Sequence, residues 1–394
     1  MELKLQDLPF QRIKQKVKTI EMRLNDERRE NIHPGEILTL LNQVTGEVLS
    51  AEVIKIERFP NFTELYKHFD KKKLGYLDNE TANADDMLKF YKVEQINKYG
   101  VLAIQIDLIK EKREYMNEVK NQTLTGERAA YASIDTEFID CTFQDGESPL
   151  KESRHILVKN CAFKWKYPLW YIDDVVVKNT TWYKDSRSGV WYTKNISIFD
   201  SNINAPKQFR RCENLTIRNS DIPDALETLW ACNNVVIDNM HAKGDYFGMN
   251  CKNVKVYNLR IDGNYCFDGA ENLEIHNSIF NSKDSFWNCK NVVICNSVIK
   301  GEYLAWNSEN ITFINCELES NQGLCYIKGV KLINCKVNNT DLCFERCSDV
   351  DAEIITKVIS IKNPYNGIIR CKGYDEIILD KKVIDPSKVK IEII

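Results

Sequence analysis

Hydrophobic and polar positions recur with a period of about 19 residues over most of this chain. In each copy a leading Asn is followed by apolar residues one and three positions later, and then by a trailing Asn. The segment Asn214–Asn219, which reads Asn-Leu-Thr-Ile-Arg-Asn, shows the pattern, and copies start at positions 174, 195, 214, 234, 253, 272, 291, 310 and 329. The alternation predicts a strand with one buried face. A repeat this regular decides the architecture of the region that contains it.

Each repeat has room for three short strands. A second alternating pair follows the trailing Asn, as in Ser297 and Ile299, and a third segment places Phe267 or Phe286 five residues before the next leading Asn. One such unit cannot bury its own apolar face, so successive units must stack. The sequence therefore predicts a mainly β fold, a right-handed, single-stranded parallel β-helix. The alternative, a leucine-rich repeat, needs Leu at fixed sites and a helical or 3₁₀ return, and the repeat has neither.

Two rows of polar or small residues accompany the repeat. We expect side-chain amides in the first row to bond from coil to coil at a bend, and residues in the second to fit a tight interior corner. The first row is Asn219, Asn239, Asn258, Asn277, Asn296, Asn315 and Asn334, and the second is Cys212, Cys232, Cys251, Ala270, Cys289, Ser308 and Cys347. Cysteines in a buried row are expected to be free, packed thiols. Disulfides between neighbouring coils are the alternative, because stacked strands lie about 4.8 Å apart.

Composition narrows the function classes only slightly. A net charge of −3 over 394 residues gives no global sign of polyanion binding. The first residues carry charge without an apolar run, and no apolar stretch reaches membrane-spanning length, so we expect neither a signal peptide nor a membrane protein. The chain has no CxxC pair and its five histidines lie far apart. Together with the free thiols, this predicts a cytoplasmic protein without a metal or cofactor.

Residues 1–112 lack the repeat and form a separate predicted domain. Its apolar pattern predicts a small mixed β-barrel with peripheral helices. Strands are expected at residues 1–5, 18–24, 37–41, 48–59 and 101–109, and helices at 9–17, 62–69 and 84–91. Residues 113–133 are polar and charged, and are expected to serve as the linker and the cap of the solenoid, which must hide an open edge. The β-helix domain is expected to cover residues 134–394.

The spacing Lys18-x-x-Glu21-x-Arg23 is the sharpest chemical feature of the first domain. On a strand, Glu21 and Arg23 share one face, while Lys18 falls on the other unless the strand is bent. A Lys, a Glu and an Arg held close together can bind a phosphate or hydrogen-bond the edge of a base. The alternative is a salt-bridge network on the surface.

This region resembles a known family. The stretch from Phe10 to Arg23, the Pro34-Gly35-Glu-Ile turn and the Gly100-Val-Leu-Ala-Ile-Gln-Ile segment are similar to an ASCH domain of the PUA-like superfamily. That family carries a Gly-x-Lys-x-x-Glu-x-Arg signature that lines a cleft proposed to bind RNA or a nucleotide. The resemblance implies that Lys18, Glu21 and Arg23 line the cleft, although Lys16 stands where Gly is usual. Some members hydrolyse acetylated cytidine with a Thr at the place of Glu21, so that activity is not expected here.

The third segment of each repeat varies in chemistry. It gathers aromatic and charged residues on one face, and these are the candidates for a ligand-binding face: Lys207, Arg210, Arg211, Glu227, Trp230, Tyr246, Tyr265, Lys283, Trp287, Glu302, Tyr303 and Trp306. Aromatic rings beside carboxylates suit sugars, and spacings of about 4.8 and 9.6 Å bracket the carboxylate separations of glycoside hydrolysis. Asp245, Asp268 and Asp284 are therefore candidate catalytic residues, and Lys207 and Arg211 can instead bind or deprotonate a uronic acid. The alternative is that the rings fill the corner and the charges pair across coils.

Residues 120–380 also resemble a bacterial family with a pectin-lyase-like β-helix, through phrases such as Ser282-Lys-Asp-Ser-Phe-Trp and Gly301-Glu-Tyr-Leu-Ala-Trp. This resemblance implies a fold and no activity. We expect an ASCH-like module that binds RNA or a nucleotide, joined to a β-helix with a face for a carbohydrate or a protein. One alternative is a polysaccharide hydrolase or lyase acting on the β-helix face, and another is a structural solenoid for protein docking.

Overall fold

A computed structural model describes residues 1–29, 32–46, 48–77, 79–109 and 115–394. The chain divides into two compact units, residues 1–114 and 115–394. Strands make up 49% of the protein and helices 9%. Among the described residues, no helix is both long and apolar enough to cross a membrane.

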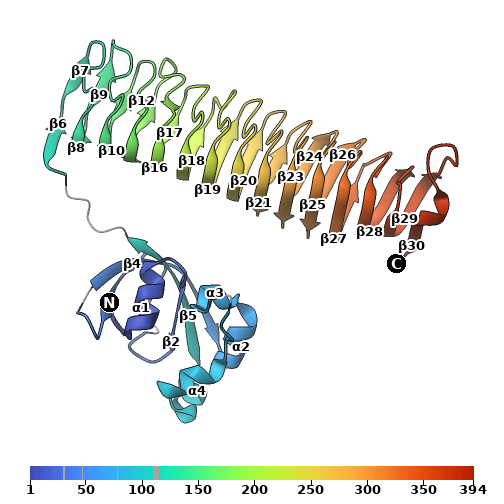
Figure 1. The fold of residues 1–394 in the computed structure, drawn as a ribbon, viewed down its shortest axis with the longest axis horizontal. Helices are drawn as coiled ribbons and strands as arrows, with labels where there is room; N and C mark the ends of the chain where they lie inside the picture. Colours follow the sequence, from blue (N-terminus) through green and yellow to red (C-terminus); the bar gives the residue numbers. More distant parts are fainter. Residues whose placement is uncertain (30–31, 47, 78, 110–114) are drawn as a thin grey trace. The chain divides into compact units, whose positions relative to one another are not determined.

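The first unit is a five-stranded mixed sheet with helices around it (Figure 1). Strand β1 pairs in parallel with β3, the other pairings are antiparallel, and the order β1-β3-β4-β5-β2 puts β1 and β2 at opposite edges. The elements are β1 (Glu2–Leu5), α1 (Asp7–Lys14), β2 (Ile20–Leu24), β3 (Ile37–Asn42), β4 (Val48–Phe59), α2 (Phe62–His68), α3 (Lys71–Leu74), the 3₁₀ helix η1 (Ala84–Lys89), α4 (Val93–Tyr99) and β5 (Val101–Ile109). The five strands and three helical segments expected from the sequence are present, and α3 and α4 are additional.

Strand β5 is buried on both of its faces, which explains its continuous apolar run. Leu102 and Ile104 join a core with Phe10 and Ile13 of α1. Val101 and Ala103 join a second core that contains buried residues of β2, α2 and α4. The sheet is therefore covered on both faces. Its two edge strands, β1 and β2, each have one side without a backbone partner in the sheet.

The second unit is a β-solenoid, as expected (Figure 1). It has about 15 turns. Equivalent apolar positions stack in register from coil to coil, as Leu215 on Val235 and Val235 on Val254. The early strands are β6 (Asn117–Lys120), β7 (Thr123–Thr125), β8 (Ile134–Ile139), β9 (Thr142–Gln144), β10 (Arg154–Lys159), β11 (Ala162–Phe163), β12 (Leu169–Trp170), β13 (Asp173–Lys178), β14 (Thr181–Trp182), β15 (Val190–Trp191), β16 (Lys194–Phe199) and β17 (Asn202–Ile203). The later strands are β18 (Glu213–Ile222), β19 (Asn233–Lys243), β20 (Lys252–Asp262), β21 (Glu271–His276), β22 (Ile279–Asn281), β23 (Lys290–Cys295), β24 (Val298–Glu302), β25 (Glu309–Ile314), β26 (Glu317–Asn321), β27 (Lys328–Asn338), β28 (Ser348–Lys362), β29 (Gly367–Ile378) and β30 (Val389–Ile393), with the 3₁₀ helix η2 (Pro386–Lys388) before the last.

Two details of the solenoid differ from the sequence expectation. Strands β6 and β7 already pair in parallel with β8 and β9, so the first coil lies within the segment expected to be linker and cap. Within residues 115–394, the third segment forms a separate strand pair at β12 and β15, with isolated bridges from Arg210 to Trp191 and Trp230 and from Cys343 to Ile361. In other coils this segment turns, and residues such as Tyr246 and Phe267 adopt the left-handed conformation there, with φ of 60° and 59°. Left-handed residues bend the chain and so help it to close a coil.

The predicted asparagine row is present and its geometry explains the residue type. Asn219 and Asn239 are left-handed, with φ of 49° and 50°. The side-chain amide of Asn239 donates to Asn219 Oδ1 at 2.9 Å, and that of Asn334 donates to Asn315 Oδ1 at 2.9 Å. Asn is the non-glycine residue that best tolerates this conformation, and its amide can both donate and accept along the stack.

The cysteine row has a second role beyond its small size. Cys232 Sγ donates to the carbonyl oxygen of Phe209 at 3.1 Å, and Ser308 Oγ makes the equivalent contact with Phe286 at 2.7 Å. Each side chain thereby donates to a carbonyl of the preceding coil, and both a thiol and a hydroxyl can do so, which is why Cys and Ser interchange in this row. All 14 cysteines are free, so the disulfide alternative does not hold in this structure.

Candidate functional site

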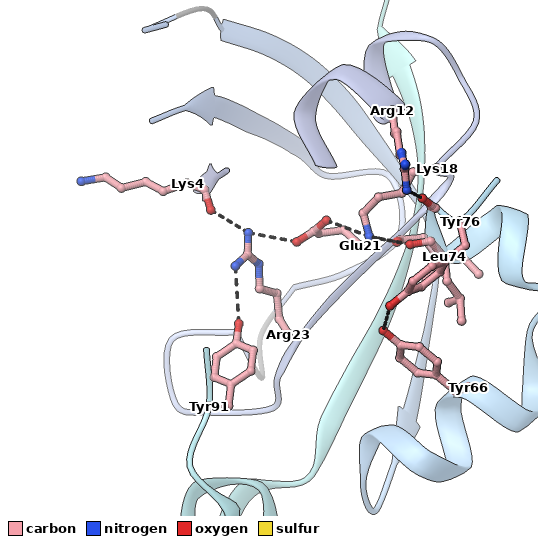
Figure 2. A network of polar contacts seen from close by, with 11 residues as sticks. Lys4, Arg12, Lys18, Glu21, Arg23, Tyr66, Leu74, Tyr76 and Tyr91 are labelled. Carbon is pink, nitrogen blue, oxygen red and sulfur yellow. Dashed lines mark hydrogen bonds and ion pairs between the residues drawn. The ribbon is translucent and has the colours of Figure 1, made fainter. Parts of the chain in front are cut away.

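The candidate functional site lies between the two edge strands of the first unit, β1 and β2. A cavity of about 840 Å³ lies there, lined by residues of β1, α1, β2 and the segment from Asp86 to Tyr91. Arg23 of β2 reaches across the gap, and its Nη2 donates to the backbone carbonyl of Lys4 in β1 at 2.8 Å (Figure 2). The cavity is therefore built into the point where the curved sheet does not close with backbone hydrogen bonds.

The floor of this cavity carries the three residues singled out in the sequence, and the structure brings all three together (Figure 2). Glu21 Oε1 lies 2.9 Å from Arg23 Nη2, and Glu21 Oε2 lies 3.3 Å from Lys18 Nζ. Lys18 and Glu21 are only 5% and 4% exposed. The surface salt-bridge alternative does not describe this arrangement, because the ion pairs are buried. We refer to Lys18, Glu21 and Arg23 as the buried triad.

Lys18 joins the triad because the strand starts later than the alternating pattern suggests. Strand β2 begins at Ile20, so Lys18 lies in the turn before it, and its Nζ donates to the carbonyl of Ile20 at 2.6 Å. The turn itself is made by Lys16, whose φ of 60° is left-handed. This is the position where Gly is usual in the ASCH signature. The turn is therefore kept with a lysine in place of glycine, and the bend that the sequence left open is present.

The electrostatics of the triad are those of charges held out of water. Burial lowers the pKa of Lys18, and the neighbouring Glu21 carboxylate only partly opposes this effect. Burial also acts to lower the pKa of Arg23, but Glu21 and Tyr91 outweigh it and the pKa is raised. Two buried polar atoms of the triad, Glu21 Oε2 and Arg23 Nε, have no hydrogen-bond partner. Glu21 Oε2 thus has an ion pair with Lys18 but retains unused capacity to accept a hydrogen bond.

Tyrosines form the wall of the cavity, and reasoning from the sequence missed them. The Tyr66 and Tyr76 hydroxyls lie 3.0 Å apart (Figure 2). The Tyr76 hydroxyl also donates to Asp86 Oδ2 at 3.0 Å. Tyr91 accepts from Arg23 Nη1 at 3.4 Å, and its ring stacks on Phe62 with centroids 5.7 Å apart. Burial raises the pKa values of Tyr66 and Tyr76, so both are neutral hydrogen-bonding groups.

Basic residues predominate around the cavity, with seven of them against three acidic residues. The basic residues are Lys4, Arg12, Lys18, Arg23, Arg28, Arg29 and Lys89, and the acidic ones are Glu2, Glu21 and Asp86. Arg12 donates to the carbonyl of Gly75 and lies 2.5 Å from Glu80 Oε1, which ties α1 to the segment after α3. An anionic ligand would therefore meet a favourable field at this cavity.

The aromatic residues expected on a solenoid face are stacked mainly on one another. The ring centroids of Trp170 and Trp191 are 5.0 Å apart, and the ring planes meet at an angle of 7°. The Arg210 guanidinium lies 4.6 Å from the ring centroids of both Trp191 and Trp230. Tyr246 stacks on Tyr265 at 4.7 Å and Trp287 on Trp306 at 5.8 Å, while Tyr303 meets Trp306 edge-on. The indole N–H groups of Trp230, Trp287 and Trp306 donate to backbone carbonyls of the next coil at 2.6–2.7 Å.

The charged residues of that face pair across coils. Glu227 Oε2 lies 3.2 Å from Lys207 Nζ and 3.6 Å from Arg210 Nη2. Lys283 Nζ lies 3.0 Å from Glu302 Oε1, and Arg211 lies over the ring of Tyr192. These contacts follow the pattern in which rings fill the corner and charges pair between coils.

The three candidate aspartates occupy three different positions along the coil. Asp245 Oδ1 accepts from the backbone N–H of Asn264 at 2.7 Å, and Asp268 Oδ1 accepts from the side chain of Asn288 at 2.8 Å. Asp284 is 8% exposed, and its pKa is raised by burial and by the nearby Glu302 carboxylate. Among the described residues, no group of three potential ligands is placed to hold a metal ion.

Comparison with known proteins agrees with this two-part organisation. The family described as "ASCH domain" matches residues 3–110, within the first unit. The solenoid matches the family described as "Protein of unknown function (DUF3737)" over residues 117–392, and the chain belongs to this family. No curated protein is significantly similar to the chain.

Several solved structures are similar to this chain. The crystal structure of hypothetical protein PH0355 is 31% identical and covers 27% of this chain and 97% of that one, with a TM-score of 0.24. Protein PF0455 from Pyrococcus furiosus is 31% identical in sequence, and the match covers 28% of this chain and 99% of that one, with a TM-score of 0.22. A third similar structure is tailspike protein gp49 from Acinetobacter baumannii bacteriophage Fri1, a capsular polysaccharide depolymerase. It is 9% identical in sequence, and the match covers 96% of this chain and 74% of that one, with a TM-score of 0.36.

Proposed function

We propose that the ASCH domain binds a nucleotide, free or as part of RNA, in the cavity between β1 and β2. The observation that carries this proposal is the Glu21 carboxylate, buried between two cations at the cavity floor with Oε2 accepting no hydrogen bond. Glu21 Oε2 is ion-paired with Lys18 but is not fully hydrogen-bonded, and a buried polar group that is only partly satisfied at a cavity is suited to a ligand that completes it.

The chemistry of the buried triad suits a base edge. The free lone pairs of Glu21 can accept an N–H group of a base, while Lys18 and Arg23 can donate to a ring nitrogen or a carbonyl oxygen. The basic residues at the cavity suit the phosphate, and a volume of about 840 Å³ lies within the range of small-molecule sites. The members that hydrolyse acetylated cytidine have a Thr where this chain has Glu21, so we propose binding without hydrolysis.

The alternative function, a solenoid that acts on carbohydrates, has less structural support than nucleotide binding. A sugar ring that stacks on an aromatic side chain needs an open ring face, whereas many rings of the solenoid face each other across coils. Asp245 and Asp268 already accept hydrogen bonds within the solenoid. The RNA or nucleotide proposal is therefore the one we pursue.

The test is binding of fluorescein-labelled single-stranded RNA to the full chain, followed by fluorescence anisotropy across a salt series. Arg23→Ala removes a donor to the base and should weaken binding by about 5- to 150-fold, the range for one good base contact. The matched control is Lys55→Ala, which removes an exposed cation of β4 that does not line the cavity. Circular dichroism verifies that both variants are folded. If neither RNA nor mononucleotides bind at low salt, or if Arg23→Ala binds as tightly as the unchanged protein, the proposal is wrong.

A further inference from the structure

An exposed aromatic side chain lies at the cavity and has no part in the buried triad. Phe90 lines the cavity, yet 57% of its surface is exposed to solvent. Its neighbour Tyr91 lines the same cavity but is half-buried, bonded to Arg23 and stacked on Phe62. The two consecutive rings therefore differ in role, since Tyr91 holds the buried triad and Phe90 leaves a large apolar surface to solvent.

The surroundings of Phe90 are basic. Lys89 precedes it and is 71% exposed while paired with Asp86 at 2.9 Å. Arg28, also exposed, lines the same cavity. An exposed ring beside exposed cations is the combination with which proteins bind unpaired nucleotides, because the ring stacks on a base and the cations meet the phosphate.

We propose that the ligand is single-stranded RNA, with one nucleotide in the cavity and the base of an adjacent nucleotide stacked on Phe90. This inference rests on the proposed function and makes it specific. A base can enter the cavity only when it is unpaired and turned out of a helix, which favours a single strand over a duplex. A free mononucleotide would occupy the cavity and leave Phe90 exposed, so Phe90 distinguishes the polymer from its monomer.

The experiment compares two ligand sizes on the full chain. Isothermal titration calorimetry measures the affinity of each ribonucleoside 5′-monophosphate and of each uniform octaribonucleotide. Phe90→Ala should weaken octanucleotide binding by about 5- to 150-fold, the range for one stacked base, and leave mononucleotide affinity unchanged. Phe90→Trp should keep or improve octanucleotide affinity. The matched control is Leu88→Ala, which removes an exposed apolar side chain of η1 that does not line the cavity and should change neither affinity.

The outcomes separate this inference from the function on which it rests. If octanucleotides bind Phe90→Ala as tightly as the unchanged protein, the stacking position is refuted while nucleotide binding in the cavity stands. Equal losses for the monophosphate and the octanucleotide would also refute it, because Phe90 would then belong to a single-nucleotide pocket. If the unchanged protein binds neither ligand, the proposed function itself fails.

Discussion

Neutralising Glu21 tests whether the buried triad is held together by its central carboxylate. Glu21→Gln keeps the shape of the side chain but leaves Lys18 and Arg23 buried, at 3.3 and 2.9 Å from a neutral group. Removing one partner of a buried ion pair costs about 3–5 kcal/mol, because the remaining charge stays buried without compensation. That cost is a large share of the stability of a small domain, which is typically about 5–15 kcal/mol.

The same substitution should make stability depend on pH in a defined direction. Burial already lowers the pKa of Lys18, and the Glu21 carboxylate is what opposes this effect. Without the carboxylate, the pKa of Lys18 in the folded protein falls further below its value in the unfolded chain. The folded state then binds fewer protons than the unfolded state between these two pKa values, so stability rises with pH in that window. We therefore expect the loss of stability in Glu21→Gln to shrink as the pH rises towards the ordinary pKa of lysine, about 10.4.

The chain offers separate probes for its two units. All seven tryptophans lie between positions 165 and 306, so tryptophan fluorescence follows the solenoid alone. The helices α1–α4 all lie in the first unit, so circular dichroism at 222 nm is sensitive to that unit. With a urea m-value of about 1.5 kcal/mol/M, the midpoint of the first unit should fall by about 2–3 M, while the fluorescence transition stays in place.

The control is Glu64→Gln, which removes an exposed carboxylate 2.8 Å from Lys67 on α2. Exposed pairs of this kind contribute about 0–1 kcal/mol. The reasoning is refuted if the midpoint of Glu21→Gln shifts no more than that of Glu64→Gln, or if its deficit grows as the pH rises.

Two further predictions concern backbone geometry and the cysteine row. Cys251→Val should destabilise the solenoid by about 1–3 kcal/mol, because the buried carbonyl of Leu229 loses the Cys251 thiol, which donates to it at 3.0 Å, whereas Cys251→Ser should cost less. Urea unfolding followed by tryptophan fluorescence measures both, and equal losses would contradict the hydrogen-bonding role. Lys16→Gly should stabilise the first unit by about 0.5–1 kcal/mol, since a left-handed non-glycine residue costs about 1–2 kcal/mol and glycine gives back part of this through chain entropy. Circular dichroism at 222 nm measures the change, and a loss of stability would contradict the strain at this turn.

The architecture of the solenoid was available from the sequence because its contacts have a constant spacing. A residue meets its equivalent in the next coil about 19–20 positions later, as Leu215 meets Val235, so one pattern repeats many times along the chain. The Asn row was visible for the same reason, and the left-handed bend explains why the pattern selects Asn. The third segment was expected to be a short strand and pairs as one in only some of the coils, and alternation alone does not reveal left-handed residues such as Tyr246.

The cavity was decided by tertiary structure. The sequence marked Lys18, Glu21 and Arg23, but only the turn at Lys16 brings Lys18 to the same side as the other two. Arg23 meets Tyr91 across 68 positions, and Arg12 meets Glu80 across the same separation. Each of these contacts occurs only once, so no repeating sequence pattern predicts it. The sequence by itself therefore determined the repeated fold and the candidate triad, while only the folded chain determined that the triad is buried at a cavity, because its walls come from segments whose proximity depends on the packing of the whole domain.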